Sequence, residues 1–281
     1  RVYSVKTTYF AVYEPDAEVY KVVLNAVDGK FADGTTEKTV ADIPFGRPVK
    51  ELEKPAPNAS GLVFSHYENE SGYPVTVIEK GVKLYARYAK PVSTFEDLLN
   101  INLAPDRNYV LMNHITAGGS LWDEHGLVSW TAIGANSPRG FSGTFNGNGY
   151  RISVSAKSGS GQNFGFFSRI SGTVYNLSVV GYFAIDGTTD AKSLGAFAGE
   201  VAAEGRVVDC QSLIRFRIAV TATQPLSAAG AIGVNYGLID GLMTSAGGEI
   251  SIDSSCAFCI GSTVGSNYGT VRNVNQSGRG G

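Results

Sequence analysis

Residues 233–241 read GVNYGLIDG and residues 265–273 read GSNYGTVRN, so the chain repeats nearly the same phrase after thirty-two residues. The fifth residue of each phrase is a glycine that also recurs further upstream. The aligned positions are Gly172, Gly205, Gly237 and Gly269, at spacings of 33, 32 and 32 residues. A fixed period in the range of about 20–50 residues indicates that the backbone itself repeats.

The residues that follow each repeated glycine fall into three classes. A β-branched residue stands two positions later, a turn-forming residue four positions later and an apolar residue five positions later. The three sets are Val174, Val207, Ile239 and Val271; Asn176, Asp209, Gly241 and Asn273; and Leu177, Cys210, Leu242 and Val274. This order predicts strand, corner and strand. Because no amphipathic helix intervenes, it indicates a parallel β-solenoid over about residues 100 to 281, with the first set stacked inward.

Corners of such a coil suit Asn, Asp and Gly, which tolerate left-handed backbone angles. Asn235 and Asn267, followed by Tyr236 and Tyr268, continue the same ladder one corner earlier. A further pattern of Gly, any residue, then Phe or Ile precedes each repeat. In its last copy Gly261 falls one residue out of register, and the letters AAE lengthen the second copy, which predicts an insertion in a loop.

The first ninety residues differ in composition from the rest. They hold six of the thirty-five glycines but twenty-four of the forty-eight charged residues. Pro91 is expected to break a strand at the boundary, and Ser93 with Glu96 forms a capping-box pattern for a short helix through Leu98 and Leu99. We therefore expect a small, mostly β domain over residues 16–91 and the solenoid with its capping helix over 92–281. Residues 1–15 are interpreted as the last strand of a preceding module.

Two stretches carry family resemblances. The order VVLNAVDGKFADGT, IPFGRPVKELEKPAP, GLVFSHYEN and GVKLYARYAK, over about residues 20–90, resembles one internalin-B-type (Listeria–Bacteroides) repeat. The resemblance implies a β-grasp-like module of bacterial surface proteins without catalytic residues. At FSHY the family usually has a Trp, and Tyr67 is expected to fill that core position.

The second resemblance starts at DRNYVLMNHI and runs to the C-terminus, with FSGTFNGNGY as its strongest element. It is similar to the GLUG-motif regions of bacterial surface proteins and adhesins, and it implies a right-handed parallel β-helix. After NYVLMN the family is usually acidic, whereas this chain reads HITAGG, so no cation site is carried over. Together the two resemblances predict an all-β chain in which a β-grasp-like module precedes a right-handed parallel β-helix.

Composition excludes several function classes. The formal net charge of −2 and the pI near 6.0 do not suit a nucleic-acid-binding protein, which should be basic. No apolar run approaches the roughly 20 residues of a membrane span. The first residues, RVYSVKTTYF, lack an initiator Met and an apolar signal core, so we expect a mature or excised fragment whose targeting signal lies outside it.

No metal or cofactor site is expected. Cys256 and Cys259 form CAFC, but a zinc site would need a second ligand pair, and a thioredoxin-like site would need a following helix. The three cysteines are therefore interpreted as buried thiols or an incidental disulfide, with Cys210 on an apolar ladder. His114 and His125 flank a loop that holds Asp123 and Glu124, a set that could form a weak metal cluster. Because the four residues have no fixed ligand spacing, a solvated loop is favoured. The letters FNGNGY predict a tight turn, not a phosphate-binding loop.

Two classes of function remain. Parallel β-helices also host polysaccharide lyases and hydrolases. Asp209 and Asp240 occupy neighbouring positions of the repeat, and Arg272 falls in the same register as Asp240, one turn away. A surface ion pair between the acid and the arginine is the simpler interpretation. The residues that recur instead suit a solenoid scaffold. We expect a non-enzymatic, adhesin-like segment, extracellular at a bacterial surface or secreted, whose parent chain is anchored to that surface. It would bind a host-surface protein or a glycan through loop residues such as Trp122, His125 and Arg139. The alternative is a carbohydrate-active enzyme or a glycan-binding module.

Overall fold

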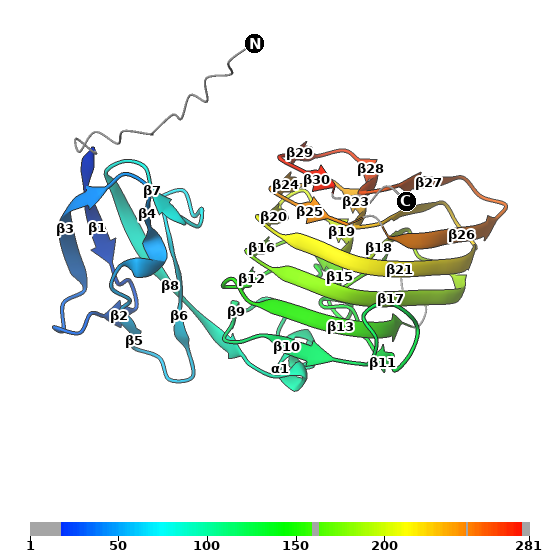
Figure 1. The fold of residues 1–281 in the computed structure, drawn as a ribbon, viewed down its shortest axis with the longest axis horizontal. Helices are drawn as coiled ribbons and strands as arrows, with labels where there is room; N and C mark the ends of the chain where they lie inside the picture. Colours follow the sequence, from blue (N-terminus) through cyan, green and yellow to red (C-terminus); the bar gives the residue numbers. More distant parts are fainter. Residues whose placement is uncertain (1–17, 159–162, 246, 277–281) are drawn as a thin grey trace, which may run out of the picture. The chain divides into compact units, whose positions relative to one another are not determined.

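A computed structural model describes residues 18–158, 163–245 and 247–276 of the chain (Figure 1). The chain divides into two compact units. One comprises Arg1–Ser60 and His66–Arg87, and the other comprises Gly61–Ser65 and Tyr88–Gly281. The strand expected within residues 1–15 lies outside the described residues.

The first unit is built on a small mixed sheet, in which β1 pairs antiparallel with β3 and parallel with β8. Its elements are β1 (Val19–Asn25), β2 (Gly29–Lys30), β3 (Glu37–Pro44), β4 (Arg47–Pro48), the 3-10 helix η1 (Val49–Glu51), β5 (Ala56–Pro57) and β7 (Val77–Ile78). Two further strands, β6 (Val63–Glu68) and β8 (Val82–Val92), belong partly to this unit and partly to the second. Between residues 18 and 87 the helical element is this single 3-10 turn, and the predicted β-grasp arrangement is not confirmed.

The side chains of the first unit follow the predicted alternation. In β8, Leu84 and Ala86 are buried, and Lys83 lies on the opposite face. Tyr67 is 1% exposed, and its hydroxyl donates a 2.6 Å hydrogen bond to the Glu53 carbonyl. The prediction that Tyr67 occupies a core position is confirmed, and its phenol is satisfied by the backbone.

The predicted break at Pro91 is wrong, because β8 continues to Val92 and pairs in parallel with β9 (Tyr109–Leu111). The bonds to β9 use the amide of Lys90 and the carbonyl of Val92. The proline nitrogen, which carries no hydrogen, is not needed for this pairing, so the strand tolerates it.

The capping helix is present, but it begins one residue later than predicted. The helix α1 (Phe95–Asn100) is capped by Thr94, whose hydroxyl accepts from the Asp97 amide, while the Asp97 carboxylate accepts from the amides of Thr94 and Ser93. Asp97 thus takes the place predicted for Glu96. The 3-10 helix η2 (Ile101–Leu103) follows, and the fully buried Leu98 and Ile101 join the solenoid core.

Residues beyond the helix form a parallel β-solenoid of about five turns, as predicted (Figure 1). Four stacks of parallel strands line it. The long sheet contains β10 (Ile115–Ala117), β11 (Val128–Ser129), β13 (Arg151–Ser158), β17 (Ser178–Thr189), β21 (Gln211–Ala222), β25 (Met243–Thr244), β26 (Gly248–Ser254) and β30 (Asn275–Gln276). The ladder sheet contains β9, β12 (Thr144–Asn146), β16 (Thr173–Tyr175), β20 (Arg206–Val208), β24 (Leu238–Asp240) and β29 (Thr270–Arg272).

Two four-stranded sheets complete each turn. One contains β14 (Asn163–Phe164), β18 (Ser193–Gly195), β22 (Leu226–Ala229) and β27 (Phe258–Gly261). The other contains β15 (Phe167–Ile170), β19 (Ala198–Val201), β23 (Ile232–Asn235) and β28 (Val264–Asn267). Along one turn the chain passes from the ladder sheet through the long sheet and these two sheets back to the ladder sheet.

The predicted ladder is confirmed in register. Val174, Val207, Ile239 and Val271 are direct partners on successive strands of the ladder sheet. The first three are fully buried, whereas Val271, on the last described turn, is 37% exposed. The corner positions carry the left-handed backbone that was expected: φ is 51° at Asn176, 49° at Asp209, 73° at Gly241 and 54° at Asn273.

Glycine recurs before the ladder because the turns approach one another closely there. A Cβ at Gly237 would fall within contact distance of the carbonyl oxygens of Ala202 and Gly205, and Gly269 meets the Gly237 carbonyl in the same way. The AAE insertion lies, as predicted, in the loop between β19 and β20. The letters FNGNGY likewise form a turn between β12 and β13, with positive φ at Asn148 and Gly149.

One register prediction is wrong. Gly261 pairs with Ala229, which pairs with Gly195, so Gly261 is in register with the earlier turns. Gly230 is the displaced glycine. The sequence pattern aligned Gly230 with Gly195, because the true register partner of Gly195 on that turn is Ala229 and not a glycine.

Candidate functional site

The outer face of the long sheet is a ladder of polar and aromatic side chains. Alternate residues of β21 point inward and are buried, whereas Arg215 and Arg217 lie on the outer face. Tyr182 of β17 is the register partner of Arg215. A second column consists of Lys157, Ala184, Arg217 and Glu249. The face is continuous because β17 and β21 pair over their whole length.

A loop between β10 and β11 folds over this face. It closes on itself through two backbone hydrogen bonds, from Gly119 to Gly126 at 2.8 Å and from Ser120 to His125 at 2.9 Å. The fully buried Ser155 of β13 donates its hydroxyl to the Ser120 carbonyl. A Cβ at Gly118 would collide with the Ser155 backbone, so only glycine allows this approach. The loop, residues 118–126, is therefore anchored to the sheet, and we call it the anchored loop.

The tip of the anchored loop holds two of the predicted binding residues. Trp122 is 67% exposed, although tryptophan is usually largely buried. The His125 side chain is 89% exposed, and its Nδ1 lies 2.9 Å from the Asp123 carboxylate. The pKa of Asp123 is lowered, first by the hydrogen bond from the His125 amide and then by the one from the His125 ring.

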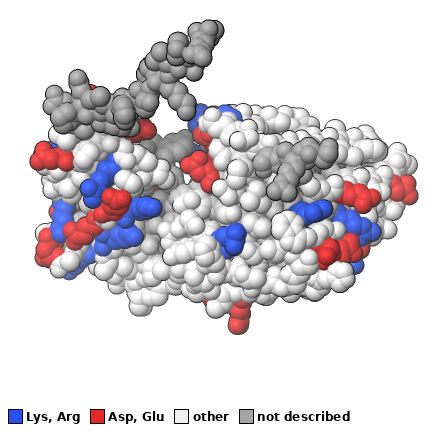
Figure 2. All heavy atoms as spheres, in the orientation of Figure 1, with Lys and Arg blue, Asp and Glu red and all other residues white. Residues whose placement is uncertain are grey.

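Glu124 ties the loop to the two long strands. Its carboxylate lies 3.1 Å from the Arg217 guanidinium and accepts a 3.5 Å contact from the Tyr182 hydroxyl. Asp186 lies 3.0 Å from the Lys157 ammonium. Over the solenoid, Figure 2 shows basic and acidic side chains next to one another, with uncharged surface around them. Burial, followed by the charge of Glu124, raises the pKa of Tyr182.

The other predicted residues lie elsewhere. Arg139 is exposed on the loop between β11 and β12, which is bracketed by bridges from Ile133 and Phe141 to β15, outside the long sheet. The His114 ring packs edge-on against Tyr150 at 5.3 Å, and its Nδ1 accepts from the amide of Arg151. Of the four groups considered as a metal cluster, Asp123 and His125 pair with each other, His114 bonds the Arg151 amide and Glu124 pairs with Arg217. Within the described ranges no three His, Cys, Asp or Glu side chains converge on a metal-sized space.

A second polar cluster lies at a corner of the solenoid. The Arg272 guanidinium contacts the Asp240 carboxylate at 2.7 and 2.8 Å, and Asn273 donates to the same carboxylate at 2.7 Å. The predicted ion pair is present. These hydrogen bonds, the one from Arg272 first, lower the pKa of Asp240. Burial and the charge of Asp240 instead raise the pKa of Asp209, which lines a hollow of about 210 Å³ with Asn176 and Ser178.

The cysteines do not form a site. Cys210 is buried, as predicted, and desolvation raises the pKa of its thiol to about 12. Cys256 and Cys259 are free thiols, and the interpretation of both as buried is wrong because Cys259 is exposed and Cys256 half-buried. These two residues lie on the last described turn, and no further described turn packs against them.

The tyrosine ladder is a feature of the coil stacking. The rings of Tyr236 and Tyr268 stack 5.1 Å apart with 13° between their planes, which is close to the spacing of successive strands. Below them, the Asn235 amide donates to Asn267 at 2.7 Å. Each ring covers one face of the other, while both side chains remain exposed, Tyr236 at 47% and Tyr268 at 71%.

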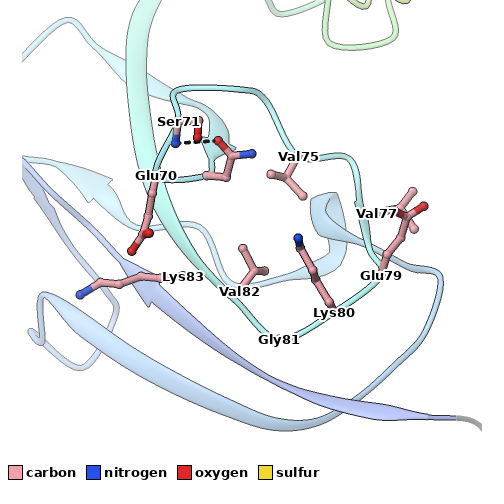
Figure 3. A pocket seen from close by; sticks show the side chains of 10 residues that line it. Glu70, Ser71, Val75, Val77, Glu79, Lys80, Gly81, Val82 and Lys83 are labelled. Carbon is pink, nitrogen blue, oxygen red and sulfur yellow. Dashed lines mark hydrogen bonds between the residues drawn. The ribbon is translucent and has the colours of Figure 1, made fainter.

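The first unit contains a hollow of about 470 Å³ between β6, β7 and β8. Figure 3 shows Val75, Val82 and Lys80 turned toward its middle, while Glu70 and Glu79 point away. The lining mixes valines with polar and charged side chains, and of its two lysines Lys83 is paired with Glu37, so the hollow offers no set of convergent catalytic groups.

Several residues of the outer face were not singled out in the sequence. Tyr182, Arg215 and Arg217 look like ordinary exposed strand positions, and the alternation in QSLIRFRIAV is the only signal that places the two arginines on one face. The sequence indicated Glu124 only as a potential metal ligand. Its contact with Arg217 joins residues 93 positions apart, which no local pattern reveals.

Comparisons with family models, curated proteins and solved structures give no match to this chain. In the described ranges, no helix combines the length and the apolar character that crossing a bilayer requires. The fold itself defines the class, an all-β chain with a parallel β-solenoid.

Proposed function

We propose that this chain is a non-enzymatic, adhesin-like segment of an extracellular bacterial protein, surface-anchored or secreted, in which the long sheet presents a binding face to a host glycan or host-surface protein. The resemblances to an internalin-B-type repeat and to GLUG-motif regions support this proposal, since both occur in long bacterial surface chains.

The observation that carries the proposal is the anchored loop. A loop fixed by Ser155 and by the Glu124–Arg217 pair nevertheless holds Trp122 in solvent. Exposing an indole forgoes the free energy of burying a large apolar side chain, so a rigid loop that does this is typical of a binding surface. Binding residues are commonly found on loops held by a rigid scaffold.

The test is a glycan array and a host-protein binding screen with the whole chain. Trp122→Ala and His125→Ala should weaken binding without changing the melting temperature, because both side chains are exposed. Arg139→Ala is the matched control from a loop outside the long sheet. Binding that survives Trp122→Ala and is lost in Arg139→Ala would move the binding face away from the long sheet.

A carbohydrate-active enzyme is the second candidate, and one observation favours it. Asp209 and Asp240 lie on adjacent turns, and their pKa values are shifted in opposite directions, as in the acid and base of glycoside hydrolysis. Turnover of a polysaccharide that disappears in Asp240→Asn or Arg272→Ala, with the fold intact, would establish this class instead.

A further inference from the structure

The cations on the outer face of the long sheet are not all neutralised, since Arg151 of β13 and Arg215 of β21 have no ion pair among the described residues. Arg217 is paired with Glu124, and Lys157 with Asp186. Arg215 is exposed, and in the part of the chain that the structure describes it has no ion pair. Its guanidinium is therefore available to an anion from outside the chain.

The neighbours of Arg215 leave room for such an anion. On the preceding turn its register partner is Tyr182. On the following turn it faces Gly247, where an added Cβ would meet the Arg215 side chain at 3.6 Å. Since glycine brings no side chain, this side of Arg215 is open. Among the described residues, the partner of the Tyr182 hydroxyl is Glu124, at 3.5 Å, which is long for an O–H···O hydrogen bond.

An apolar surface lies beside this group. Trp122 precedes Glu124 by two residues, which span at most about 7 Å of chain. The Glu124 carboxylate contacts both Tyr182 and Arg217, so the backbone of Trp122, whose side chain is exposed, lies near the same part of the face. The carboxylates of Glu124 and Asp186 both lie beside Arg217, at 3.1 and 4.0 Å, and would repel a continuous polyanion such as a nucleic acid. A single negative group can approach Arg215, which lies opposite Tyr182 on the side of Arg217 away from Asp186.

We infer that this surface binds an acidic saccharide, with a sugar ring packed on the Trp122 indole and the anionic group at Arg215 and the Tyr182 hydroxyl. The inference rests on the proposed function of the long sheet as a binding face. A guanidinium recognises carboxylate and sulfate groups through charge-assisted hydrogen bonds, and aromatic side chains supply the apolar contact that the ring faces of a sugar need.

The experiment compares three probes against the whole chain by calorimetry: a galacturonate oligosaccharide, its methyl ester, and a sulfated oligosaccharide. The ester keeps the sugar rings and removes the charge. We expect the acid to bind about tenfold more tightly than the ester, the factor typical of one charge-assisted hydrogen bond. Arg215→Gln should abolish the preference for the acid. Arg107→Gln is the control, because it removes an exposed arginine between η2 and β9, outside the long sheet, and it should leave the preference unchanged. Trp122→Ala should weaken both forms.

The outcomes separate the two claims. Equal binding of acid and ester, or an unchanged preference in Arg215→Gln, overturns the inference. If Trp122→Ala still weakens both forms in that case, the binding face stands and only the acidic ligand is wrong. Binding of the sulfated probe with the same loss in Arg215→Gln supports the inference with sulfate as the source of charge. Failure of all three probes to bind overturns it, while the glycan and protein screens decide the proposed function separately.

Discussion

The ladder of the solenoid provides a test of how burial sets stability. Val207 and Val271 occupy the same register of the ladder sheet, but Val207 is fully buried and Val271 is 37% exposed. Val207→Ala removes two methyl groups, at about 0.8 kcal/mol each for transfer from water. A residual cavity of about 50 Å³ at about 24 cal/mol per Å³ adds roughly 1.2 kcal/mol. The expected loss in the free energy of unfolding is thus about 2.5–3 kcal/mol.

Val271→Ala should cost much less. About two thirds of the transfer free energy applies to a side chain of this exposure, and no enclosed cavity forms beside an open turn, so the expected loss is about 1 kcal/mol. Val174→Ala, at a fully buried turn, should match Val207→Ala.

Urea unfolding followed by tryptophan fluorescence measures these losses. The chain has two tryptophans, both in the second unit, and the ring of Trp130 is buried and stacked on Phe166 at 4.9 Å. The emission of Trp130 therefore reports unfolding of the solenoid and not of the first unit. Equal losses for Val207→Ala and Val271→Ala would refute the reasoning that the inner turns are enclosed and the last one open.

Three further predictions follow from single contacts. Asp209→Asn should stabilise the solenoid slightly, by less than about 1 kcal/mol at neutral pH, because partial burial and the charge of Asp240 disfavour a carboxylate that is still exposed and screened by solvent. Since its pKa is raised above 3.8 in the folded state, the gain should vanish in urea titrations below pH 3.8, where the side chain is protonated in both states. Gly237→Ala should lower the unfolding free energy by about 1–3 kcal/mol, because its Cβ would press on carbonyls of the preceding turn, and an unchanged urea midpoint would contradict that contact. A thiol reagent should modify Cys256 and Cys259 in the folded protein and spare the buried Cys210, so rapid loss of three thiols would argue against the packing around Cys210.

The stability contribution of Asp240 depends on pH in the opposite direction from that of Asp209. The pKa of Asp240 is lowered in the folded state by Arg272, so its contribution to stability is present above its ordinary pKa and is lost as the pH falls through the folded value. Because the Arg272 side chain is 60% exposed and that of Asp240 is 20% exposed, this contribution is partly screened by solvent and salt.

The repeat, the ladder register and the corner positions could all be predicted from the sequence. Each depends on which residue types recur at a fixed period, and that period is a direct record of one turn of backbone. Val174, Val207 and Ile239 stack because β-branched residues return to the same point of every coil, and Asn176, Asp209 and Asn273 turn the chain because short polar side chains tolerate left-handed angles.

Local errors arose where a residue type has more than one role. Pro91 indicates a strand end, yet it fits a strand whose hydrogen bonds to β9 come from its neighbours. Ser93 and Thr94 are both good caps, and the actual cap depends on which backbone amides the carboxylate of Asp97 reaches. Gly230 and Gly261 look alike in the sequence, and only strand pairing shows which of them aligns with Gly195.

The candidate site was decided by tertiary structure alone. Trp122 and His125 could be named from the sequence as exposed loop residues, but their placement over the long sheet depends on contacts between Glu124 and Arg217 and between Ser120 and Ser155. A repeating sequence determines a repeating scaffold, since each turn meets the same neighbours as the turn before it. A loop that interrupts the period has no equivalent on the other turns from which its position could be predicted. The position of the anchored loop depends on Ser155 and Arg217, which lie 35 and 93 residues from their loop partners and become neighbours only when the turns stack.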